Sequence, residues 1–117
     1  MGRVLLADDD QLVRLGLRMA LERFGHTVVE AGDGGSFMTE LAETRFDLCI
    51  MDLAMPGPPL AERLSAARAK SVPVLVLTGY EPPTQSQPSD VLAYATKPIQ
   101  LRELHSALER LGLQRGR

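Results

Sequence analysis

Several polar residues stand at the ends of short apolar runs, and their types could together hold a metal ion and a phosphoryl group. Asp8 and Asp9 follow one run, Asp52 a second, Thr78 a third, and Lys97 comes shortly after a fourth. Carboxylates gathered at one place repel each other, by about 4 kcal/mol for a pair about 4 Å apart at an effective dielectric near 20. A divalent cation removes that cost. Mg²⁺ suits such a site because it takes one or two carboxylates, waters and phosphate oxygens.

Each residue alone also has an ordinary structural explanation. Asp10 precedes a predicted helix and is best interpreted as its N-cap. Asp52 could begin a turn before Pro56, Thr78 could close a strand, and Lys97 could be a solvated loop residue. The combination favours a shared site, because each residue falls at the end of its own predicted strand.

The apolar runs predict five strands, over residues 4–7, 27–31, 47–51, 72–77 and 91–95. Apolar residues also recur at helical spacing and predict amphipathic helices on four stripes: Val13, Leu17, Ala20, Leu21 and Phe24; Phe37, Met38, Leu41 and Ala42; Leu60, Leu64 and Ala67; Leu101, Leu104, Leu108 and Leu111. Strands that alternate with helices predict a parallel sheet covered on both faces. Polar residues after such strands converge at the carboxyl edge of the sheet.

Length and composition narrow the function further. The chain has 117 residues, which predicts a single domain over 1–117. A formal net charge of -2 argues against direct nucleic-acid binding, which needs a basic surface. No apolar stretch approaches the roughly 20 residues that span a bilayer, and no secretory segment precedes the charged cluster, so we expect a cytoplasmic protein with no membrane contact. The single cysteine, Cys49, is interpreted as a small buried hydrophobic residue.

Four ordered motifs resemble the receiver domain of bacterial two-component response regulators. They occupy residues 4–10, 48–57, 74–79 and 94–98, so the resemblance covers essentially the whole chain. It implies an α/β fold of the flavodoxin-like, doubly wound type. In this fold five parallel strands lie in the order 2-1-3-4-5, with helices on both faces.

The resemblance also implies roles for individual residues. Asp52 would accept a phosphoryl group from a sensor histidine kinase or a histidine phosphotransfer protein. Asp9 and Asp52 would bind Mg²⁺ directly, and Asp8 would act through water. The backbone carbonyl of Ala54 would complete the protein ligands.

Thr78 and Lys97 would bond the phosphoryl oxygens, and Tyr94 stands where the family keeps its switching aromatic residue. A phosphoryl group adds about 1.5–2 negative charges. Thr78 and Lys97 can bond it only by moving toward it, which biases a two-state backbone. The expected output is an altered contact with an effector protein or a covalently linked output domain. The chain is therefore expected to be no enzyme beyond its own phosphorylation and dephosphorylation.

Two segments depart from the family pattern. Residues 58–60, Pro-Pro-Leu, stand where an acidic residue and a glycine are usual, which leaves the shape of that loop open. Prolines at 82, 83 and 88 disfavour the usual fourth helix, so residues 80–89 are predicted to form a loop or at most one helical turn.

Other functions fit the sequence less well. A Mg²⁺-dependent phosphatase or phosphotransferase would need a second acid just after its nucleophile, but Leu53 and Ala54 follow Asp52. A flavin binder would need a phosphate loop after the first strand, where three aspartates would repel phosphate instead. A receiver fold that has lost phosphorylation and only docks to partners remains an alternative.

Overall fold

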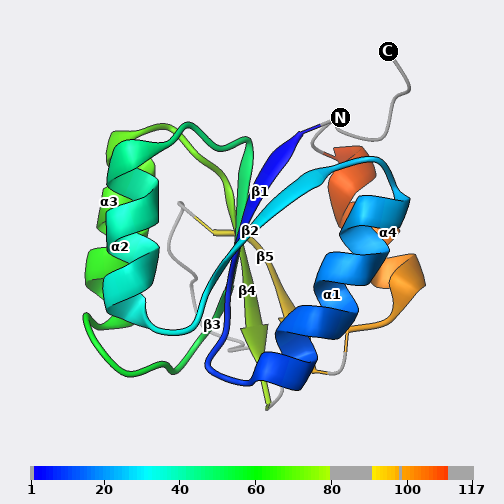
Figure 1. Ribbon diagram of the computed structural model, residues 1–117, viewed down its shortest axis with the longest axis horizontal. Coiled ribbons are helices and arrows are strands. Elements are labelled where there is room, and N and C mark those ends of the chain that lie inside the picture. The colour runs from blue at the N-terminus through cyan, green and yellow to red at the C-terminus, as the bar shows by residue number, and fades with distance from the viewer. Residues whose placement is uncertain (1, 80–90, 98, 111–117) are drawn as a thin grey trace.

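The computed structural model describes residues 2–79, 91–97 and 99–110 (Figure 1). Strands alternate with helices as far as residue 78. The strands are β1 (Arg3–Ala7), β2 (Thr27–Ala31), β3 (Leu48–Asp52), β4 (Val74–Thr78) and β5 (Val91–Thr96). The helices are α1 (Gln11–Arg23), α2 (Gly34–Glu43), α3 (Leu60–Ala69) and α4 (Leu101–Arg110). The strands form one parallel sheet in the order β2-β1-β3-β4-β5. The predicted parallel α/β architecture is confirmed.

Helices cover both faces of the sheet. Figure 1 shows α2 and α3 on one side of the strands and α1 and α4 on the other. Along β1, Val4 and Leu6 belong to the core on the α1 and α4 side, whereas Leu5 and Ala7 belong to the core on the α2 and α3 side. Because both faces are buried, the strands show as continuous apolar runs in the sequence.

Local signals fix where α1 begins and ends. The side chain of Asp10 accepts hydrogen bonds from the backbone N–H groups of Leu12 and Val13, as the predicted N-cap requires. Gly25 follows the helix with φ of 95°, a conformation that glycine adopts without a Cβ clash. The helix therefore starts directly after Asp8 and Asp9 and leaves both at the carboxyl end of β1.

Several sequence predictions were wrong in detail. The third strand is Leu48–Asp52 rather than 47–51, and Ala42, predicted on an apolar stripe, is exposed. β4 begins at Val74 rather than at residue 72. Leu101, predicted to lie on the buried stripe of the last helix, is 63% exposed. The buried face of α4 is made by Leu104, Ala107 and Leu108. At 100° per residue Leu101 lies about 60° from Leu104, on the edge of that face.

Other predictions have a plain outcome. Cys49 is buried, as expected. The predicted loop over 80–89, and Leu111 at the end of the last stripe, lie outside the described residues. Among the described helices, none is both long and apolar enough to cross a membrane.

Candidate metal and phosphoryl site

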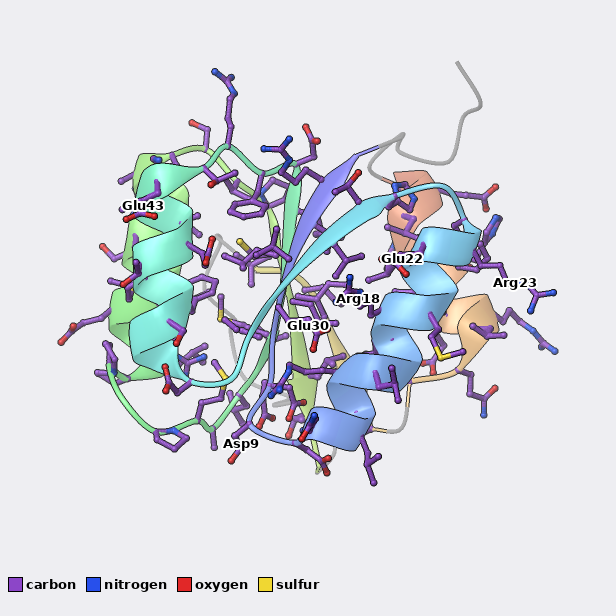
Figure 2. All side chains as sticks on the ribbon, in the orientation of Figure 1. Asp9, Arg18, Glu22, Arg23, Glu30 and Glu43 are labelled. Carbon is purple, nitrogen blue, oxygen red and sulfur yellow. The ribbon has the colours of Figure 1, made fainter. Side chains whose placement is uncertain are left out.

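The predicted polar residues meet at one end of the sheet, where the strand order reverses. The chain passes from β1 to β2 on one side and then returns to β3 on the other side of β1. In open parallel sheets the crevice at such a switch point is the usual ligand site. Asp8 and Asp9 follow β1, and Asp52 ends β3. Figure 2 shows Asp9 at the lower edge of the molecule, at the opposite end from Glu43 on α2.

Three aspartates form a compact acidic cluster in this crevice. One carboxylate oxygen from each of Asp8, Asp9 and Asp52 lies within 4.8 Å of the others. Asp8 is 0% exposed and Asp52 is 8% exposed, whereas Asp9 is open to solvent. The cluster therefore combines two buried carboxylates, Asp8 and Asp52, with the solvent-accessible carboxylate of Asp9.

Lys97 joins the carboxylates of two strands. Its Nζ lies 2.8 Å from Asp8 Oδ2 and 3.0 Å from Asp52 Oδ1. Its backbone N–H donates to the carbonyl of Thr78 at 2.8 Å, and Thr78 is itself buried at the end of β4. Asp8, Asp52, Thr78 and Lys97, predicted from separate motifs, are thus neighbours in the structure.

Burial and charge shift the pKa values in this cluster. Burial raises the pKa of Asp52, the hydrogen bond from Lys97 opposes that rise, and the nearby charge of Asp8 adds to it. Burial acts to lower the pKa of Lys97, but its bonds to Asp8 and Asp52 outweigh burial and leave that pKa raised. Lys97 therefore stays positively charged. Additional positive charge near Asp52 would favour the ionised form of the Asp52 carboxyl group.

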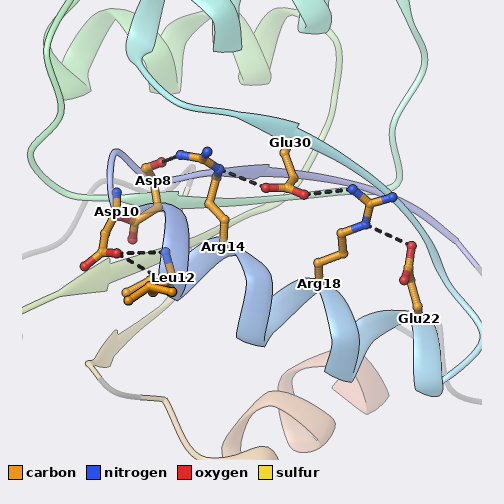
Figure 3. A network of polar contacts seen from close by, with 8 residues as sticks. Asp8, Asp10, Leu12, Arg14, Arg18, Glu22 and Glu30 are labelled. Atoms are coloured by element: carbon orange, nitrogen blue, oxygen red, sulfur yellow. Dashed lines mark hydrogen bonds and ion pairs between the residues drawn. The ribbon is translucent and has the colours of Figure 1, made fainter.

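The loop that carries Asp8 is held by a network of polar contacts (Figure 3). Asp8 Oδ1 accepts from the backbone N–H of Asp10 at 2.8 Å, and the Asp8 carbonyl accepts from Arg14 Nη1 at 2.6 Å. Arg14 also pairs with Glu30 on β2 at 2.9 Å, and Glu30 pairs with Arg18 at 2.8 Å. Helix α1 and strand β2 together fix the backbone beneath the acidic cluster.

The donor set fits a hard divalent cation. It offers carboxylate oxygens, which Mg²⁺ and Ca²⁺ prefer over nitrogen or sulfur. Asp8 Oδ2 is buried, and its partner among the described residues is Lys97 Nζ at 2.8 Å. Ala54 is exposed, and within the described residues no hydrogen bond reaches its carbonyl. The exposed Asp9 carboxylate and the Ala54 carbonyl are therefore available as ligands, whereas Asp8 Oδ2 is held by Lys97.

Tyr94, predicted as the switching residue, lies on β5 with its backbone opposite Val76 of β4. Its side chain is outside the described part of the chain. The structure therefore places its backbone in the strand that leads to Lys97 and leaves its role as a prediction.

One residue at the site was missed by the sequence analysis. Arg63 of α3 is only 1% exposed and donates to the carbonyls of Asp52 and Leu53. A signal was present, because Arg63 lies three positions after Leu60 and four before Ala67, on the apolar stripe of α3. A buried guanidinium needs hydrogen-bond acceptors inside the protein. An arginine on an apolar stripe therefore indicates a side chain that is hydrogen-bonded in the interior.

Comparison with known proteins identifies the class. Residues 4–109 match the family described as the response regulator receiver domain. The chain belongs to this family, whose members are signalling domains of two-component systems and not classical enzymes.

Individual relatives agree with this assignment. The chain is 35% identical over 113 residues to the transcriptional regulatory protein PdtaR of Mycobacterium tuberculosis, with 92% of this chain and 55% of PdtaR covered. It is 32% identical to the response regulator receiver protein CpdR of Brucella abortus, with 95% of this chain and 97% of CpdR covered. It thus spans about half the length of PdtaR and nearly all of CpdR.

The fold is similar to that of solved receiver domains. The chemotaxis response regulator CheY4 of Vibrio cholerae superposes with a TM-score of 0.84 at 29% identity, covering 95% of this chain and 98% of CheY4. The match therefore extends over nearly the whole of both chains.

Proposed function

We propose that Asp52 is the phosphoacceptor of this receiver domain and that the domain extends over the whole chain, 1–117. The observation that carries the proposal is the position of the Asp52 carboxylate. It ends β3 within the acidic cluster, and Lys97 Nζ lies 3.0 Å from one of its oxygens. A carboxylate, the ammonium of Lys97 and further oxygen ligands therefore lie close together, which supports a role for Asp52 as the nucleophile.

The reaction follows from the chemistry of these groups. An oxygen of the ionised Asp52 attacks the phosphorus of a phosphorylated histidine, the new P–O bond forms, and the P–N bond breaks with its electron pair going to the histidine nitrogen. Asp9 and Asp52 would hold Mg²⁺, with the Ala54 carbonyl as a further ligand and Asp8 acting through water. Mg²⁺ would supply positive charge that offsets the charge developing on the phosphoryl oxygens.

Lys97 and Thr78 would respond to the product. The new phosphoryl group competes with Asp8 for the ammonium of Lys97, and the Thr78 hydroxyl would donate to a phosphoryl oxygen. The backbone bond from Lys97 to the Thr78 carbonyl at 2.8 Å couples the two strand ends. Through Tyr94 on β5, this change would reach the surface and alter partner binding.

We infer the partners from the class of domain. The donor would be a sensor histidine kinase or a histidine phosphotransfer protein. The phosphorylated domain would then act on an effector protein or on an output domain linked to this chain. An output domain is considered because this chain spans about half of PdtaR. We also infer that the domain acts in the cytoplasm, together with the proposed phosphodonor and effector.

Labelling with a small phosphodonor tests the phosphoacceptor. Acetyl phosphate with Mg²⁺ should add one phosphoryl group to the wild type and none to Asp52→Asn, because an amide cannot attack phosphorus. Asp47→Asn is a matched control, since Asp47 precedes β3 and caps the backbone N–H of Arg3 at the other end of the sheet. Equal labelling of Asp52→Asn and the wild type would refute the assignment.

A further inference from the structure

The loop after Asp52 is held by a buried arginine that has no role in the function proposed above. Arg63 Nη1 donates to the Asp52 carbonyl at 2.9 Å, Nη2 donates to the Leu53 carbonyl at 3.0 Å, and Nε donates to the Pro58 carbonyl at 3.1 Å. A fourth contact joins Nη1 to Met51 Sδ at 3.4 Å. All these acceptors are uncharged, so the guanidinium is bonded to backbone and sulfur, not to a carboxylate.

These bonds fix the orientation of two peptide groups next to the phosphoacceptor. In the peptide between Asp52 and Leu53, the carbonyl accepts from Arg63 and the N–H donates to the Leu77 carbonyl at 2.7 Å. In the next peptide the Leu53 carbonyl points to Arg63. Because a trans peptide is planar, the Ala54 N–H must point away from Arg63.

The far end of the loop is fixed from a second direction. The backbone N–H of Gly34, at the start of α2, donates to the Pro56 carbonyl at 2.8 Å. A Cβ on Gly34 would lie 3.0 Å from Pro58 Cδ, so the loop and the helix are in close contact. Gly57 has φ of 107°, which lets the chain turn between these two contacts. Carbonyls on both sides of Ala54 are thus occupied, and the Ala54 carbonyl is left available.

We propose that Arg63 is a positioning residue for phosphorylation: its guanidinium holds the peptides that follow Asp52 and so presents the Asp52 carboxylate and the Ala54 carbonyl to the metal and the phosphoryl group. This proposal rests on the function proposed above. It also accounts for the loop 58–60, whose Pro-Pro-Leu sequence replaces the usual acidic residue and glycine. The loop is shaped here by hydrogen bonds from α3.

The first test measures the backbone itself and needs neither metal nor phosphodonor. Arg63→Met keeps a long apolar side chain and removes the donors. Hydrogen exchange at the Leu53 amide should become faster in this variant, because its peptide loses the bond to Arg63. The control is Lys70→Met, which removes a cation that donates to the carbonyls of Leu41 and Ala42 on α2. Lys70→Met should leave exchange at Leu53 unchanged.

The second test separates positioning from stability. Arg63→Met should unfold at lower urea concentration, because it leaves the buried Asp52 carbonyl without its donor. Lys70→Met should lose less stability, because the bonds it removes are part-buried and exposed. Only Arg63→Met should also slow labelling by acetyl phosphate, roughly tenfold or more, since displacement of a reacting group by about 1 Å has effects of this size. It should also weaken Mg²⁺ binding measured by calorimetry without a phosphodonor.

If Arg63→Met fails to fold, the same exchange, labelling and Mg²⁺-binding measurements are made on Arg63→Lys. An ammonium keeps the charge but lacks the planar fork, so it should restore labelling only in part. Unchanged exchange at Leu53 in a folded variant would overturn the positioning of the backbone. Wild-type labelling and Mg²⁺ affinity despite faster exchange would overturn the role in phosphorylation. If the wild type itself takes no label, the proposed function fails, while the exchange measurement still decides whether Arg63 holds the loop.

Discussion

Glu30 shows how one side chain away from the reacting groups supports the site. It accepts from Arg14 and Arg18, and Arg14 in turn donates to the Asp8 carbonyl. The bonds from Arg18 and then Arg14 lower the pKa of Glu30, against the opposing effect of burial. The ionised form of Glu30 therefore stabilises the folded state.

Replacing this glutamate should give a pH-dependent loss of stability. Glu30→Gln should lower the free energy of unfolding at pH 7 by about 0.5–1 kcal/mol, as for ion pairs at a partly exposed site. A lowered pKa contributes stability above the unfolded-state pKa, near 4.5, that is lost as the pH falls through the folded-state pKa. Urea unfolding at a series of pH values should show the two proteins converging in acid. Glu43→Gln, at an exposed position of α2, is the control, and a Glu30→Gln deficit that persists unchanged in strong acid would contradict the prediction.

The reactivity of Cys49 tests whether β3 stays buried in the native protein. It is 0% exposed within β3, and burial raises the pKa of its thiol to about 12. The thiolate is the reactive form, so a disulfide reagent at pH 8 should leave the native protein unmodified and react fully in denaturant. Rapid modification under native conditions would show that β3 opens to solvent.

The loop after β3 and the start of α2 are in close contact, so a side chain added at Gly34 should destabilise the fold. Gly34→Ala should lower the free energy of unfolding by about 1–3 kcal/mol, because its Cβ would lie 3.0 Å from Pro58 Cδ and 3.1 Å from the Pro56 carbonyl. Gly16→Ala in α1 is the matched control. Nothing lies within 4 Å of its Cβ, and alanine in a helix interior should add about 0.5–1 kcal/mol. Urea midpoints that fail to separate the two variants would argue against a rigid contact at Gly34.

The acidic cluster exists only in the folded chain, because it joins residues at the ends of β1 and β3. A cation that binds it should therefore stabilise folding. Mg²⁺ at 100 times its dissociation constant should add about 2.7 kcal/mol. For a domain of about this size each kcal/mol raises the melting temperature by roughly 3–6 °C. Asp9→Asn should abolish most of this shift and Asp47→Asn should retain it; a full shift in Asp9→Asn would place the metal elsewhere.

The residues that meet at the site could be predicted from the amino-acid sequence. Parallel strands bury both faces, so their apolar runs and the polar residues that end them are visible without a structure. Parallel strands also bring their carboxyl ends to one edge, which is why Asp8, Asp52 and Lys97 could be predicted as neighbours. The N-cap Asp10 was equally readable, because capping depends only on the residues that follow.

The contacts that hold those residues in place could not be predicted from the sequence. The bonds from Arg63 to the Asp52 and Leu53 carbonyls depend on how α3 packs against the end of β3, and helical spacing alone does not specify that distance. The exposure of Leu101 likewise depends on what packs against that part of α4. Spacing assigns a residue to a face of its own element. Burial and bonding partners depend on the second element packed against that face, and they exist only once the chain has folded.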